Sequence, residues 1–142
     1  MAKVILGARP KVFAPFPVKF PMPDGTEGAI SVIYKYRTRS EFGQMLDSIL
    51  DAANVPPVEP VVRTALDGEV TPLEPLPGVY ERIGVQTRDA NVDHLLLSVD
   101  SWDLPQPMTR ETLVQLAEEV PAATIAMMAA YHRACTEGRL GN

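Results

Sequence analysis

The sequence predicts an α+β domain, with an N-terminal β-hairpin packed with about four α-helices and a C-terminal part that is all helical. Apolar and polar residues alternate with a period of two in two segments before residue 37, and apolar residues recur at helical spacing in 38–53 and over much of 80–142. The 142 residues are the length of one ordinary domain. We therefore expect a single domain over 1–142, divided into 1–37, 38–53, 54–79 and 80–142.

The hairpin is predicted from alternating segments at residues 11–20 and 30–36, joined by Pro23-Asp24-Gly25. Proline presets φ and glycine accepts a positive φ, so this joining segment favours a turn. Pro15 and Pro17 cannot donate ladder hydrogen bonds. The first strand is therefore expected at an edge of the sheet.

The first helix is predicted over residues 38–53, because Thr38 and Glu41 have capping-box spacing and Asn54 precedes two prolines. Its core-facing stripe is predicted to contain Phe42, Met45, Leu46, Ile49 and Leu50. Residues 54–79 are rich in proline and keep no regular period, which indicates a long connection running partly along the surface.

The remaining region, 80–142, is predicted to be helical. A second helix starts near Arg88 and closes at Trp102, and its apolar stripe consists of Val92, Leu95, Leu96 and Val99. Thr109 caps a short third helix. Pro121 begins a fourth, densely apolar helix that Gly138 ends, because proline suits a first helical position and glycine suits a C-terminal cap.

Composition argues against several classes of partner. A net charge of −5 lacks the basic footprint of a protein that binds nucleic acid. No apolar run approaches the roughly 20 residues that cross a bilayer, so we expect a soluble, unexported chain. The single cysteine, Cys135, allows no internal disulfide and fits a reducing cytosol. Oligomeric state cannot be derived from these features.

Catalytic and metal-binding patterns are weak. Cys135 as a nucleophile would need His94 or His132 as its base, although a small packing residue is the commoner role in an Ala-rich helix. Asp89 and Asp93 could share a cation with His94, but acids four residues apart more often mark a solvated helix face. No phosphate-binding glycine pattern is present. We therefore expect no catalytic residue, metal or cofactor.

Lys35, Arg37 and Arg39 form a basic cluster with Tyr34 and Tyr36 interleaved. Alternation along a strand places the tyrosines on one face and Lys35 and Arg37 on the other. This favours a half-buried strand with a basic outer face over a nucleic-acid surface, and the cluster remains available to an acidic partner.

Trp102 and the pair Met127-Met128 each allow two interpretations. Trp102 could anchor a partner, although beside Leu104 it more often covers a core. The methionines could line an adaptable groove or fill the core. Taken together, these residues indicate a binding or interaction domain without a visible active site.

Several short motifs follow one another in a particular order along the chain. The first is the strand-to-helix segment 36–42, and the others lie in the C-terminal third: Ser101-Trp102-Asp103-Leu104, then Thr109, Glu111 and Leu113, then Val120-Pro121-Ala122-Ala123, then Ala130-Tyr131-His132-Arg133-Ala134, then Glu137-Gly138-Arg139-Leu140-Gly141-Asn142. In this order, the motifs resemble the tail assembly chaperones of long-tailed bacteriophages and prophages.

The resemblance implies a non-enzymatic protein of the host bacterial cytoplasm that binds the tape measure protein and helps deliver tail tube subunits onto it. It would be absent from the finished virion, and its Met- and Ala-rich final helix would offer surface to the partner. The partner-binding residues expected are Tyr131, Arg133, Arg139 and Leu140, with Arg37 and Arg39 as a basic rim. Core packing is the alternative role for Tyr131.

Two other functions stay open on the sequence. The chain could be a structural minor tail or head-tail connection protein that remains in the particle. It could also be a small enzyme, whose site would show as a pocket where His94, His132 or Cys135 converge.

Overall fold

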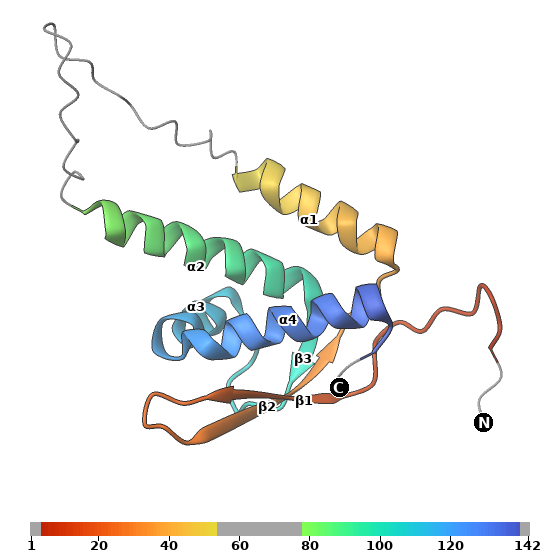
Figure 1. The fold of residues 1–142 in the computed structure, drawn as a ribbon, viewed down its shortest axis with the longest axis horizontal. Coiled ribbons are helices and arrows are strands. Elements are labelled where there is room, and N and C mark those ends of the chain that lie inside the picture. Colours follow the sequence, from red (N-terminus) through yellow and green to blue (C-terminus); the bar gives the residue numbers. More distant parts are fainter. Residues whose placement is uncertain (1–3, 54–77, 140–142) are drawn as a thin grey trace, which may run out of the picture.

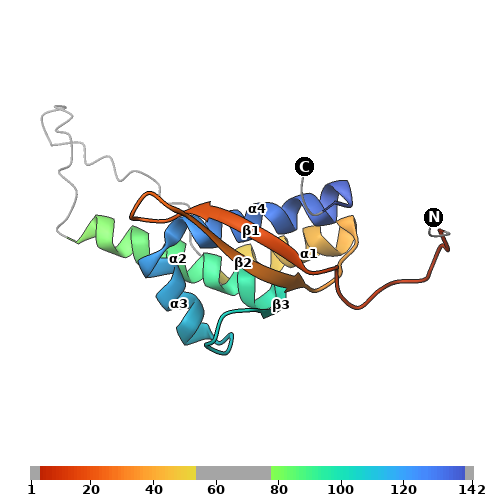
Figure 2. The same cartoon turned by 90° about the horizontal axis from the view of Figure 1, so that it is seen from below.

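The computed structural model describes residues 4–53 and 78–139. In chain order the elements are β1 (Phe16–Pro21), β2 (Glu27–Tyr34), α1 (Arg39–Ala53), α2 (Val79–Ser98), β3 (Val99–Trp102), α3 (Arg110–Glu119) and α4 (Pro121–Glu137). The helices gather on one side of the antiparallel sheet, and α4 runs across it (Figure 1). The view from below, in which the strands lie in front of α4 and α2, shows the same layers (Figure 2). The predicted α+β class is confirmed.

The hairpin is confirmed, with a shorter first strand than predicted. β1 pairs antiparallel with β2, Val18 opposite Ile30, and it lies at the edge of a sheet ordered β1-β2-β3, as its prolines require. Gly25 takes a φ of 88° in the connecting turn. Val12, at the start of the segment predicted as strand, makes only an isolated bridge to Lys35.

A third strand corrects the prediction that 80–142 is entirely helical. The second helix ends at Ser98, and β3 pairs antiparallel with β2, placing Trp102 opposite Val32. Val99 follows Leu95 at the spacing of a helical stripe, which is why the sequence predicts it on the helix. As an apolar, β-branched residue it also suits a buried strand, and it is buried in β3. A short apolar run is compatible with either a helix or a strand, so pairing with β2 decided that residues 99–102 form a strand.

The second helix also begins earlier than predicted, at Val79 instead of near Arg88. Its first turns have no apolar stripe, because Tyr80 and Ile83 are exposed and residues 80–87 do not face the core. Periodicity therefore carried no signal for this part of the helix. The proline-rich connection predicted for 54–79 lies outside the described residues apart from Gly78 and Val79, and the single-domain prediction stays a prediction.

The predicted caps within the described residues are confirmed. The Thr38 N–H donates to Glu41 Oε1 at 3.1 Å, and the Glu41 N–H donates to Thr38 Oγ1 at 3.3 Å. Thr109 caps α3 by accepting from the Thr112 N–H. Pro121 begins α4, and Gly138 ends it with a φ of 72°. The predicted end at Asn54 lies outside the described residues.

The core lies between the inner face of the sheet and the helices. Val18, Ile30 and Val32 point into it from the sheet, and Leu95 and Leu113 from the helices. On α1 the predicted stripe is confirmed for Phe42 and Met45, which are buried, and for Leu46 and Ile49, which pack against the core while partly buried. The prediction for Leu50 is wrong, because this residue is 70% exposed.

Within the described residues, no helix by itself has the length and apolar character needed to cross a membrane. α3 and α4 taken together pass that test of length and composition, with a bend of 114° between them.

The space around two glycines predicts opposite stability changes. A Cβ at Gly28 would lie 2.8 Å from the Phe20 ring and 2.6 Å from Met22 Sδ, whereas a Cβ at Gly43 in α1 meets nothing within 4 Å. Gly28→Ala should lower the free energy of unfolding by about 1–2 kcal/mol through overpacking. Gly43→Ala, the matched control, should raise it by up to about 1 kcal/mol through better helix propensity. Urea denaturation checks both; equal effects would contradict the close approach at Gly28.

Candidate functional site

Arg37, predicted as part of a basic rim, joins three elements of the fold. It lies between β2 and α1, and its Nη1 donates to the Leu97 carbonyl near the end of α2 and to the Tyr131 hydroxyl of α4 at 2.9 Å. The Tyr131 hydroxyl in turn donates to the Lys35 carbonyl at 2.9 Å. We call Arg37, Tyr131 and these two carbonyls the Arg37 bracket. The half-buried Arg37 guanidinium is therefore engaged inside the protein.

Tyr131 is fully buried at the centre of an aromatic cluster. Its ring stacks on Tyr34 with centroids 5.1 Å apart and meets Phe42 edge-on at 5.5 Å. The Tyr34 hydroxyl donates to the Met127 carbonyl at 2.7 Å, so both rings bind α4 to the sheet. Burial raises the pKa of both hydroxyls above the ordinary value, which keeps them protonated and able to donate. The structure thus gives Tyr131 the core role that the sequence allowed as its alternative.

The other residues predicted for partner binding have varied surroundings. Arg39 is exposed at the start of α1, and Arg139 is exposed and pairs with Glu137 at 3.0 Å. Arg133 is half-buried on α4, and its Nε has no hydrogen-bond partner in the described part of the chain. Leu140 lies outside the described residues. The structure records contact between Arg37 and Tyr131, and a shared partner surface for the predicted set stays a prediction.

His94 packs edge-on against Tyr131 and Phe42, with ring centroids 6.1 and 6.3 Å apart. Burial, reinforced by the charges of Arg37 and His132, lowers the pKa of His94 to about 4. Its imidazole is therefore neutral near pH 7. Burial also raises the pKa of the Cys135 thiol, so the thiolate required of a nucleophile is disfavoured.

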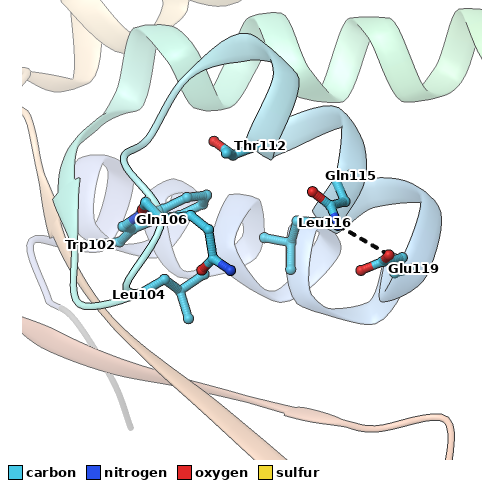
Figure 3. Close-up of a pocket in the computed structure, with 7 residues that line it drawn as sticks. All are labelled: Trp102, Leu104, Gln106, Thr112, Gln115, Leu116 and Glu119. Carbon is cyan, nitrogen blue, oxygen red and sulfur yellow. Dashed lines mark hydrogen bonds between the residues drawn. The ribbon is translucent and has the colours of Figure 1, made fainter.

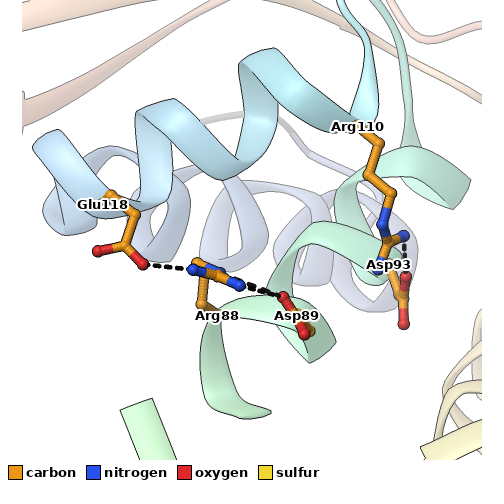
Figure 4. Close-up of polar contacts among 5 residues, drawn as sticks. All are labelled: Arg88, Asp89, Asp93, Arg110 and Glu118. Atoms are coloured by element: carbon orange, nitrogen blue, oxygen red, sulfur yellow. Dashed lines mark hydrogen bonds and ion pairs between the residues drawn. The ribbon is translucent and has the colours of Figure 1, made fainter. Parts of the chain in front are cut away.

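The acids considered as cation ligands are paired with arginines on the facing surfaces of α2 and α3 (Figure 4). Arg110 Nη1 lies 2.6 Å from Asp93 Oδ1, and Arg88 bridges Asp89 at 3.0 Å and Glu118 at 2.6 Å. The Arg110–Asp93 and Arg88–Glu118 pairs join the two helices, whereas Arg88 and Asp89 both lie on α2. Within the described residues, no group of three or more His, Cys, Asp or Glu side chains could hold a metal ion.

A hollow of about 100 Å³ lies between the end of β3 and α3 (Figure 3). Trp102, Leu104 and Leu116 form its apolar wall, and Gln115 and Glu119 lie at its polar side. The sequence indicates Trp102 as a notable residue, but it does not indicate the hollow. A short sequence pattern could not predict the hollow, because its apolar wall combines residues of β3, of the loop that follows it and of the second half of α3.

The Arg37 bracket predicts a selective loss of stability. Arg37→Ala should lower the free energy of unfolding by about 2–3 kcal/mol, because it removes two hydrogen bonds from a charged donor and leaves the buried Tyr131 hydroxyl without its donor. Arg39→Ala, at an exposed site two residues away, is the control and should change it by less than about 0.5 kcal/mol. Chemical denaturation measures both, and equal losses would argue against the bracket.

The buried His94 predicts a pH-dependent stability. Its pKa falls from 6.5 to about 4 on folding, so between these pH values His94 is protonated in the unfolded chain and neutral in the folded protein. Stability should therefore decrease as the pH falls from about 6.5 to about 4, by at most about 3 kcal/mol from this residue.

Thermal unfolding of the wild type and of His94→Asn across this range measures the contribution. The slope should be shallower in His94→Asn and largely kept in His132→Asn, because burial, not the charge of the exposed His132, is the main cause of the lowered His94 pKa. Parallel pH profiles for the wild type and His94→Asn would contradict the prediction.

A family model described as phage tail assembly chaperone matches residues 1–142. No curated protein and no solved structure matches the chain.

Proposed function

The chain belongs to the phage tail assembly chaperone family, and on that premise we propose that it binds the tape measure protein in the host cytoplasm and helps deliver tail tube subunits onto it. In this proposal the protein catalyses no reaction, and it is absent from the finished virion. The observation that carries this proposal is the family match over residues 1–142. A chaperone role in tail assembly follows from the family itself; the choice of tape measure and tail tube proteins as partners is ours.

Exposed apolar side chains on the described helices support a role in covering a partner. Leu50 is 70% exposed on α1, and Ile125 is 58% exposed on α4. A hollow between α1 and α2 is lined in part by the apolar side chains of Ile49, Leu96 and Leu97. The final helix contributes less surface than its composition suggested, because its apolar residues, Met127 among them, mostly enter the core.

Among the residues predicted to bind the partner, Arg39 and Arg139 are the exposed ones in the described structure. We assign them direct contact with acidic groups of the partner. Arg37 and Tyr131 act differently in this proposal, because their side chains are engaged in the Arg37 bracket and hold α4 against the sheet. Their replacement would affect binding through the position of α4.

Co-expression with the tape measure protein tests the proposed function. We expect the tape measure protein to become more soluble and to co-elute with this chain in size-exclusion chromatography. Mass spectrometry of purified particles provides the second measurement, and the chain should be missing from them. An insoluble, unbound tape measure protein, or this chain in stoichiometric amount in particles, would instead favour a structural minor tail or head-tail connection protein.

The basic contacts predict a charge-dependent affinity. The Arg39→Glu, Arg139→Glu double variant should bind the tape measure protein at least about tenfold more weakly, which corresponds to about 1.4 kcal/mol. The Lys11→Glu, Lys19→Glu double variant, in which two other exposed cations are reversed to acids, is the control and should bind within twofold of the wild type. Isothermal titration calorimetry at low ionic strength distinguishes them, and the assignment fails if all three proteins bind equally.

A further inference from the structure

The hollow beside Trp102 has the size of a side chain. Its volume is about 100 Å³, whereas small-molecule sites usually measure roughly 300–1,000 Å³. Trp102, Leu104 and Leu116 supply the apolar wall, and all three remain partly accessible (Figure 3). By its volume, this hollow taken alone suits one apolar side chain of another protein better than a metabolite.

The wall is held in place before any partner arrives. The Trp102 Nε1–H donates to the Gln106 carbonyl at 2.8 Å, which fixes the indole against the loop that follows β3. Thr109 and Thr112 close a reciprocal capping box at the start of α3, just beyond this loop. An ordered aromatic residue at the edge of an apolar hollow loses little conformational entropy on binding, which is typical of the residues that dominate protein interfaces.

The charge around the hollow is acidic. Glu119 lies at its rim and accepts a hydrogen bond from Gln115 Nε2 at 3.2 Å, but it has no ion pair within the described residues. No lysine or arginine lines the hollow. Arg88 on α2 and Arg110 on α3 are held by other acids. A cation of a partner would therefore find Glu119 available.

A neighbouring hollow extends this surface. It shares Trp102, Leu104 and Gln106 with the first and continues past Pro105 to Met108, and no basic residue lines it either. The side chains of Trp102 and Leu104 thus stand between two adjacent depressions, which a single peptide segment could fill with successive apolar side chains.

We propose that the hollow formed by Trp102, Leu104 and Leu116 receives an apolar side chain of a tape measure segment whose neighbouring lysine or arginine pairs with Glu119. This inference rests on the proposed function and names the chemistry of the bound segment. A second copy of this chain is the less favourable occupant, because two chains of net charge −5 would bring like charges together at an acidic rim.

The test uses the full chain labelled with 5-fluorotryptophan. Trp102 is the one tryptophan of the sequence, so the protein gives a single ¹⁹F resonance that reports on the hollow. Adding unlabelled tape measure protein to the labelled chain should shift or broaden this resonance. In parallel, Glu119→Lys should weaken binding at least tenfold. Its fold should be kept, because a lysine in the last turn of α3 suits the helix dipole.

Glu111→Lys is the matched control, since it makes the same charge change on the same helix at an exposed residue that does not line the hollow. It should bind within about twofold of the wild type. If the wild type binds but the Trp102 resonance does not change, or if Glu119→Lys binds as tightly as Glu111→Lys, the inference is overturned and the proposed function stands. If the wild type does not bind the tape measure protein at all, the proposed function fails, and the inference fails with it.

Discussion

The hydrogen bonds of the buried Tyr131 hydroxyl are the constraint on which the rest of this structure depends. A hydroxyl removed from water must find partners inside the protein, or its burial costs a substantial part of the stability. Here it accepts from Arg37 and donates to the Lys35 carbonyl. Both partners lie where β2 gives way to α1, so the bracket fixes the final helix to the place where the chain leaves the sheet.

The same interaction determines which charges are available to a partner. Arg37 points inward, where it donates hydrogen bonds to the Tyr131 hydroxyl and the Leu97 carbonyl. His94 packs against the ring of Tyr131, and its burial lowers its pKa so that the imidazole is neutral near pH 7. The cations that remain exposed are those without such buried neighbours, such as Arg39. Of the basic cluster Lys35, Arg37 and Arg39, Arg37 is therefore engaged inside the protein and is not available to a partner.

The acidic groups follow a comparable division. Asp93 and Glu118 are satisfied by arginines across the contact of α2 and α3 (Figure 4), and their pairing orients α3 against α2. Glu119, one residue further along, lines the hollow that Trp102 also lines. Adjacent acids on one helix thus have different surroundings, because successive residues on a helix point in different directions.

Local patterns predicted much of the fold because the physical causes are themselves local. Prolines placed β1 at the edge, Gly25 made the turn, and Thr38 with Glu41 began α1, each through contacts within a few residues. β3 could not be predicted in this way, since a four-residue segment becomes a strand only when β2 offers its free edge. The exposed start of α2 was missed for a related reason, because it has no apolar stripe.

The candidate sites show the same limit. The sequence marked Arg37, Tyr131 and Trp102 as notable, and its motif order indicated the family that the whole-chain match supports. It could not show that Arg37 and Tyr131 bind one another, or that Trp102 and Leu116 share a hollow. By itself, then, the sequence determined the fold class, the caps and the family, because these depend on residue order. Only the tertiary structure decided which side chains are consumed in the core and which remain for a partner, because burial depends on contacts between segments far apart in the chain.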